Sequence, residues 1–199
     1  MNIDMFWQIV DSCKDFDHPE QALEDRLSEL PAEAIAEFAH ILWWLESYAY
    51  SETMWCAAYL LNYGCSDDGF TDFRRGLVAK GRAIYELALK NPDDLACLWD
   101  KGDIRNESFG YAAHDAYARR TGLSEDAASE YLFEQYVSRE KFELYIDGKP
   151  FEGNPKTEWW DFDDEAENRK RLPRLTELNA SGFESRFPEW LTHREHCGV

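Results

Sequence analysis

The fold is decided at residues 54–81, where the sequence is MWCAAYLLNYGCSDDGFTDFRRGLVAKG. An apolar run ends in a polar corner at residues 62–69, and Phe70 and Phe73 begin a second run with the period of an α-helix. We expect Gly64 to end the first helix in a left-handed conformation, which a glycine adopts without steric penalty. Two helices joined by a short corner predict an all-α fold.

Helix boundaries along the rest of the chain are marked by proline and serine. Pro19 and Pro31 have the position of first-turn prolines, and Ser51 has that of an N-cap. Pro173 lies inside a helical pattern over 165–178, so it either kinks that helix or opens a new one. The pattern predicts many short helices in succession.

One β-hairpin signal interrupts this helical pattern. Alternating residues precede Asp147-Gly148, a pair that favours a tight hairpin turn. The sequence therefore predicts a single compact multi-helix domain over 1–178, with one small β-hairpin near 142–152. Residues 179–199 have weak periodicity, and we expect a C-terminal extension that is packed on the domain or partly flexible.

The charge of the chain is strongly unbalanced. Its 199 residues hold 40 acids and 21 bases, a net charge of −19. Residues 1–60 hold twelve acids and two bases, and residues 124–167 hold fourteen acids and four bases, so each block has a net charge of −10. Between them, residues 61–123 are nearly neutral, with ten acids and nine bases. The two acidic blocks would form one face if the fold placed them side by side.

The net negative charge disfavours some classes of binding partner and favours others. Phosphate backbones and anionic membrane surfaces would repel the protein, so we expect no direct binding to nucleic acid and none to membranes. A basic protein partner is electrostatically favoured. The chain start lacks a basic segment and no apolar run reaches the length of a membrane span, so we expect a cytoplasmic protein.

The cysteines and histidines predict no metal site and no cofactor. The five cysteines form no Cys-x-x-Cys pair, and Cys56 and Cys97 lie in apolar helical runs typical of small core residues. His193-x-x-His196-Cys197 combines two ligand types at helical spacing, but it lacks a fourth ligand and lies at the end of the chain. We therefore expect no bound metal.

Residues 62–74 resemble a bacterial family known only as domain of unknown function 4240. The opening Phe6-Trp7 and the late run at 171–175 are also similar to that family. The resemblance covers roughly residues 4–178. It implies a helical, cytosolic bacterial protein without an established activity, and it supplies no catalytic residues.

The corner admits two interpretations. As a ligand site, its polar set would be Asn62, Asp67, Asp68 and Arg74. However, neighbouring residues on a helix point about 100° apart, so the two aspartates do not naturally converge. In the structural interpretation, which we favour, Ser66 caps the second helix and both carboxylates complement its positive end.

A pair of tryptophans is the main candidate for partner binding. Trp159 and Trp160 lie in a predicted surface loop beside Asp161, Asp163 and Asp164. One ring of the pair is expected to pack in the core. The other would anchor an interface, because tryptophan is enriched among binding hot spots and carboxylates suit a basic partner.

The sequence predicts no catalytic residues, and His114-Asp115 has the pattern of an ordinary helix-surface pair. We therefore expect an acidic cytosolic protein-binding module, most specifically an immunity-type inhibitor that binds and neutralises a basic toxin or enzyme. The alternative is an enzyme or small-ligand-binding domain whose polar site is the corner at 62–74.

Overall fold

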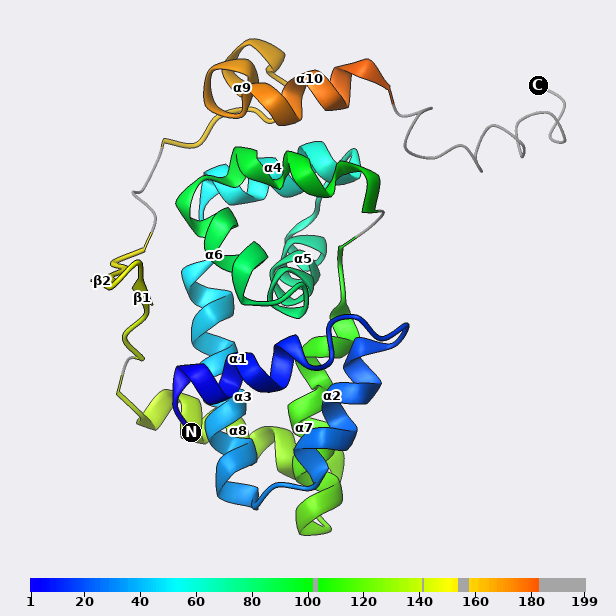
Figure 1. Cartoon of the computed structure of the whole chain (residues 1–199), viewed down its shortest axis with the longest axis vertical. Helices are drawn as coiled ribbons and strands as arrows, with labels where there is room; N and C mark the ends of the chain where they lie inside the picture. The colour runs from blue at the N-terminus through cyan, green and yellow to red at the C-terminus, as the bar shows by residue number, and fades with distance from the viewer. Residues whose placement is uncertain (102–103, 141, 154–157, 183–199) are drawn as a thin grey trace, which may run out of the picture.

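The computed structural model describes residues 1–101, 104–140, 142–153 and 158–182, and these form an all-α fold with one small hairpin, as predicted (Figure 1). The helices and strands are α1 (Ile3–Asp11), α2 (Pro19–Ser28), α3 (Ala32–Tyr48), α4 (Glu52–Asn62), α5 (Asp67–Ala79), α6 (Arg82–Lys90), the 3-10 helix η1 (Pro92–Lys101), α7 (Glu107–Thr121), α8 (Glu125–Ser138), β1 (Tyr145–Ile146), β2 (Lys149–Pro150), α9 (Glu165–Arg171) and α10 (Pro173–Ser181).

The helix starts confirm the local signals of the sequence. Ser51 accepts a hydrogen bond from the Met54 amide at 3.1 Å, as an N-cap does. Pro19 begins α2 as predicted, whereas Pro31 is the N-cap residue before α3 and lies outside its first turn. Pro173 opens α10 as a new helix and does not kink a continuous one, because α9 has already ended at Arg171.

The end of α4 differs from the prediction. Tyr63, and not Gly64, is the left-handed cap, with φ of 54° and ψ of 43°. Gly64 follows at φ 127°, and its amide donates to the Tyr59 carbonyl at 2.9 Å. The reversal therefore uses two consecutive positive-φ residues, of which only the second is a glycine.

Helix α7 is the central element of the lower half of the molecule in Figure 1. It packs against α2, α3, α5 and α8. Most of its buried residues are small, including Gly110, Ala113 and Ala116, which let neighbouring helices approach closely. The upper half is formed by α4 and η1, with α10 packed on both.

A close backbone contact joins α5 to the segment that leads into α7. A Cβ atom at Gly76 would lie 1.5 Å from the Ile104 carbonyl oxygen, so only glycine fits there. The Asn106 amide donates to the Asp72 carbonyl at 3.0 Å in the same contact. These two positions fix where α7 starts relative to α5.

The hairpin lies where the sequence predicted it. Tyr145 pairs with Pro150 and Ile146 with Lys149 in antiparallel register. Asp147 and Gly148 both have positive φ, 51° and 73°, as expected for a two-residue turn of the primed type.

The C-terminal boundary lies partly outside the described residues. Helix α10 continues to Ser181, three residues beyond the predicted domain end at 178, and the structure describes the chain as far as Gly182. The first residues of the predicted extension therefore continue α10, and residues 183–199, with the His193, His196 and Cys197 group, lie outside the described residues. In the described ranges, none of the helices has the length and apolarity needed to traverse a lipid bilayer.

We predict that Gly76→Ala destabilises the protein by about 3 kcal/mol, because the new methyl group would overlap backbone that cannot move alone. Gly69→Ala on the same helix is the control, since its Cβ would approach only side-chain atoms, the nearest being the Ser66 hydroxyl at 3.3 Å. Urea denaturation should show a change below about 1 kcal/mol for that control. Equal losses for both variants would contradict the close contact at Ile104.

Candidate functional site

The corner has the geometry of a helix cap. Ser66 is the N-cap of α5, and its hydroxyl accepts from the Gly69 amide at 3.1 Å. Asp67 and Asp68 are exposed in the first helical turn, where their charges favour the positive end of the helix. These contacts support the structural interpretation of both aspartates.

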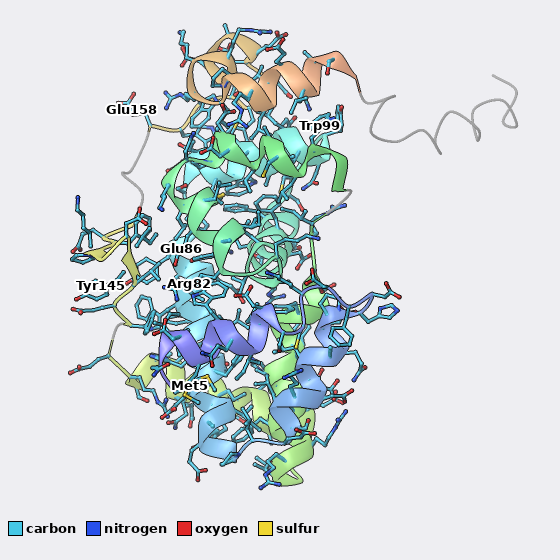
Figure 2. All side chains as sticks on the ribbon, in the orientation of Figure 1. Met5, Arg82, Glu86, Trp99, Tyr145 and Glu158 are labelled. Carbon is cyan, nitrogen blue, oxygen red and sulfur yellow. The ribbon has the colours of Figure 1, made fainter. Side chains whose placement is uncertain are left out.

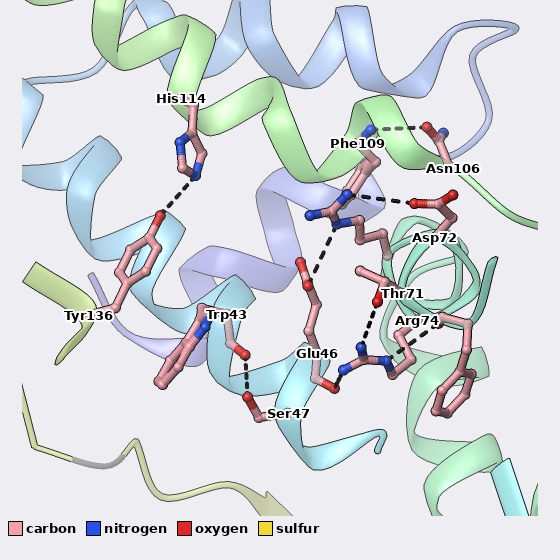
Figure 3. Close-up of polar contacts among 12 residues, drawn as sticks. Trp43, Glu46, Ser47, Thr71, Asp72, Arg74, Asn106, Phe109, His114 and Tyr136 are labelled. Atoms are coloured by element: carbon pink, nitrogen blue, oxygen red, sulfur yellow. Dashed lines mark hydrogen bonds and ion pairs between the residues drawn. The ribbon is translucent and has the colours of Figure 1, made fainter. Parts of the chain in front are cut away.

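Arg74 belongs to a different contact. Its three guanidinium nitrogens donate to the Glu46 carbonyl at 2.9 Å, the Thr71 hydroxyl at 3.1 Å and the Phe70 carbonyl at 3.4 Å (Figure 3). The guanidinium also lies 5.2 Å from the Tyr50 ring centroid. Arg74 therefore fastens α5 to α3.

The four residues of the predicted ligand site do not converge. Among the hydrogen bonds and ion pairs of the described residues, none joins Arg74 to Asp67 or Asp68. Asn62 is half-buried at the end of α4, and its Nδ2 atom has no hydrogen-bond partner within the described part of the chain. That the corner binds a ligand therefore stays a prediction.

The two tryptophans at 159–160 have different positions. Trp159 is 63% exposed, whereas Trp160 is 7% exposed and donates its indole N–H to the Asn168 side chain at 2.7 Å. The Arg171 guanidinium covers the Trp160 ring at 4.2 Å. Trp160 is therefore part of the interior in this structure, and only Trp159 is available to a partner.

The three neighbouring aspartates are exposed, and each also has a local structural contact. Asp164 caps α9 by accepting from two backbone amides. Asp163 accepts from the Tyr59 hydroxyl at 2.5 Å, which raises the pKa of Tyr59 to about 12. Asp161 accepts from the Asp163 amide at 3.0 Å. Asp161 and Asp163 are thus held in fixed positions close to Trp159 in the chain.

Trp55 joins the corner to the tryptophan segment. Its indole N–H donates to the Cys65 carbonyl at 2.9 Å, and its ring lies 6.0 Å from Trp159 and 6.3 Å from Tyr50. Tyr50 is itself 55% exposed. We call the surface formed by Tyr50, Trp55, Trp159, Asp161 and Asp163 the tryptophan face.

A second cluster of polar side chains lies between α3, α5, α7 and α8 (Figure 3). Arg75 Nε lies 3.6 Å from a Glu46 carboxylate oxygen, and its Nη1 lies 3.6 Å from an Asp72 carboxylate oxygen. His114 lies between the Ser129 hydroxyl at 3.0 Å and the Tyr136 hydroxyl at 3.1 Å. These groups line or adjoin a cavity that we call the polar cavity.

Burial shifts the pKa values of the titratable groups in the polar cavity. It raises the pKa of Glu46, an effect that the nearby Arg75 and Arg74 oppose. Burial lowers the pKa of His114, and the positive charge of Arg75 lowers it further. Burial also raises the pKa of Tyr136. His114 is therefore uncharged at neutral pH.

Sequence reasoning missed the polar cavity because its members come from four helices. The expectation that His114-Asp115 is an ordinary surface pair was wrong for His114, which is half-buried between α7 and α8. Cys97, expected in the core, is exposed, whereas Cys56 is buried as predicted. The sequence held one signal of the polar cavity, because the charged residue Glu46 directly follows the buried Leu45 in an apolar helix.

The two acidic blocks meet in a groove between α2, α7 and the start of α8. This groove has a volume of about 790 Å³ and is lined by Glu24, Asp115, Arg119, Glu125 and Asp126, among others. Burial raises the pKa of Asp115, and the charges of Glu24 and Glu125 raise it further. Carboxylates from both acidic blocks therefore lie close enough to raise the pKa of Asp115.

Comparison with known proteins identifies the family but no activity. A family model described as a protein of unknown function (DUF4240) matches residues 1–119, more than half of the chain. No curated protein and no solved structure matches the chain. The match ends within α7, so the expected resemblance beyond it, including 171–175, lies outside the matched range. The chain belongs to this family.

We predict that Ser66→Ala destabilises the protein by about 1 kcal/mol, since the Gly69 amide would lose its acceptor. Ser138→Ala, which removes an exposed hydroxyl at the end of α8, is the control and should be nearly neutral. Thermal and urea denaturation measure both variants. An unchanged stability for Ser66→Ala would remove the capping interpretation of the corner.

We predict that His114 makes stability depend on pH. Because its folded-state pKa is below the ordinary value of 6.5, its contribution is complete above that pH and declines as pH falls toward the folded-state pKa. His114→Gln should therefore lose less stability than the wild type as the pH falls from about 7 to about 5. His18→Gln, which removes an imidazole that is 80% exposed, is the control. Identical pH profiles for wild type and His114→Gln would contradict a buried neutral imidazole.

Proposed function

We propose that this member of the DUF4240 family is an acidic cytoplasmic protein-binding module, and most specifically an immunity-type inhibitor that neutralises a basic toxin or enzyme. The observation that carries the proposal is the position of Trp159. Its ring is 63% exposed, yet it packs against Trp55 and lies 4.6 Å from the Phe162 ring. An exposed tryptophan held on a fixed aromatic support has the properties of an interface anchor.

Preorganisation supports this role. A side chain that is already held by its neighbours loses little conformational entropy when it is buried by a partner. Trp55 is fixed by its hydrogen bond to the corner, and Phe162 is 7% exposed. The support of Trp159 is therefore part of the folded core and does not need to form during binding.

Charge complementarity favours a basic partner. Asp161 and Asp163 are exposed carboxylates with positions set by hydrogen bonds. The net charge of −19 would attract a cationic protein over a longer range and accelerate encounter. The acidic groove adds to this field from the opposite end of the molecule, where α8 lies far from α9 (Figure 1).

The alternative of an enzyme or small-ligand site at the corner has less support. It needs Arg74 beside Asp67 and Asp68, whereas the guanidinium bonds α3 and its own helix. The capping contact of Ser66 also accounts for an acidic first turn without a ligand.

We predict that Trp159→Ala weakens binding to the cognate partner by about 2 kcal/mol or more, as for a central hot-spot residue. The probes are the products of the two genes adjacent to this one, each co-expressed and titrated by calorimetry. Phe16→Ala is the matched control, because Phe16 is 58% exposed and lies in the loop between α1 and α2.

A charge-reversal variant tests separately whether electrostatic attraction contributes to partner binding. Glu158 precedes Trp159, and Figure 2 shows its side chain extending from the surface there. Glu158→Lys should reduce the association rate and its dependence on salt, with little change in folding stability. A complex whose affinity is unaffected by both Trp159→Ala and Glu158→Lys would exclude the tryptophan face. If neither adjacent gene product binds, the immunity-type function is wrong.

A further inference from the structure

The polar cavity has the size of a site for one small molecule. Its volume is about 160 Å³, and it lies where α3, α5, α7 and α8 meet. In another protein, a dry cavity of roughly 150 Å³ accepts benzene. The space therefore suits one ring with a small substituent.

The walls of the polar cavity favour a planar ring. Trp43 and Tyr136 both line it, and their rings are stacked with centroids 5.9 Å apart and planes 17° apart. Leu42 and Ala113 supply apolar surface between the polar groups. Phe133 also lines the cavity and is 61% exposed, so the cavity reaches the protein surface beside that ring.

One end of the polar cavity has an unsatisfied donor next to an acceptor. Arg75 Nε is buried and has no hydrogen-bond partner in the described part of the chain, because the Glu46 carboxylate at 3.6 Å is beyond hydrogen-bond distance. A buried donor without a partner is costly, and a ligand acceptor would relieve that cost. The Glu46 carboxylate beside it can accept from a ligand N–H.

Gly110 keeps this guanidinium in place. A Cβ atom at that position would lie 2.3 Å from Arg75 Nε, so α7 presents bare backbone to the guanidinium. The guanidinium also lies over the Tyr111 ring, 5.0 Å from its centroid. The donor therefore has a defined position before any ligand binds.

The charges around the polar cavity add up to zero. Glu46 and Asp72 are balanced by Arg74 and Arg75, and His114 is uncharged at neutral pH because burial lowers its pKa. A charged guest would leave an uncompensated charge in a half-buried site, which is unfavourable. An uncharged ligand matches this balance.

We propose that the polar cavity binds a small, uncharged aromatic compound with a hydrogen-bond acceptor next to a donor, such as an aromatic carboxamide or a lactam ring. Arg75 Nε donates to the acceptor, Glu46 accepts from the neighbouring N–H, and the ring lies against Trp43. The proposal is independent of partner binding at the tryptophan face, because none of that face's residues lines the polar cavity.

The first experiment measures ligand selectivity in the wild-type protein. Benzamide and 2-pyridone are titrated while the Trp43 indole resonance is followed by NMR, with benzoate and benzylamine as the charged counterparts. For fragments of this size we expect dissociation constants of about 1 mM for the two neutral probes. Binding of either charged counterpart should be weaker by about tenfold or more.

The second experiment uses a matched pair of adjacent tryptophans. Trp43→Ala should weaken benzamide binding about tenfold by removing a wall of the cavity. Trp44→Ala is the control, since Trp44 is half-buried on the same helix and touches the Trp43 ring edge-on, but does not itself line the cavity. Arg75→Lys keeps the charge and removes the fixed Nε–H donor. The affinity of this variant for benzamide should therefore be no higher than its affinity for toluene, which has no hydrogen-bonding group.

Three results would overturn the proposal. The first is the absence of any shift of the Trp43 resonance at benzamide concentrations near its solubility. The second is an equal affinity for benzamide and benzoate. The third is an equal effect of Trp43→Ala and Trp44→Ala on benzamide binding. The wild-type selectivity decides the matter on its own if a variant does not fold. Loss of partner binding in Trp159→Ala would leave all of these results unchanged.

Discussion

Arg75 lies where α3, α5 and α7 meet, and its guanidinium must stay charged in a place that is mostly shielded from water. Glu46 and Asp72 neutralise it from two helices, and Tyr111 covers it from a third. Removing one partner from such a pair would leave a desolvated charge, which costs far more than the pair contributes. The relative positions of the three helices are therefore tied to this side chain. Gly110 makes room for the side chain, and Gly76 allows α5 to approach the backbone that leads into α7.

The residues that line the polar cavity come from two regions of the chain. Glu46, Arg75 and His114 lie within the range matched by the family model, whereas Phe133 and Tyr136 lie in α8, beyond it. The tryptophan face is divided in the same way, with Trp159 outside the matched range. The matched helices thus supply the fixed polar groups and the supporting rings, and the later helices complete each site.

Local features could be predicted from the sequence because they depend on neighbouring residues. Ser51 and Ser66 cap helices as expected, and the Asp147-Gly148 turn forms the hairpin. Contacts between remote residues could not be derived in this way. Nothing in the sequence indicates that Trp55 supports Trp159 or that His114 meets Tyr136. Such contacts depend on which face each helix buries, and that is decided by packing in three dimensions.

Arg74 contacts both candidate sites. Arg74 donates to the carbonyl of Glu46, which lines the polar cavity, and its guanidinium lies over the Tyr50 ring of the tryptophan face. A shared contact is not sufficient for allosteric coupling, which also needs an element with two arrangements that the two ligands favour differently. Arg74 is fixed by three hydrogen bonds and two ring contacts in one arrangement. A rigid bridge of this kind transmits little free energy, so a ligand in the cavity and a partner on the face should bind independently of each other.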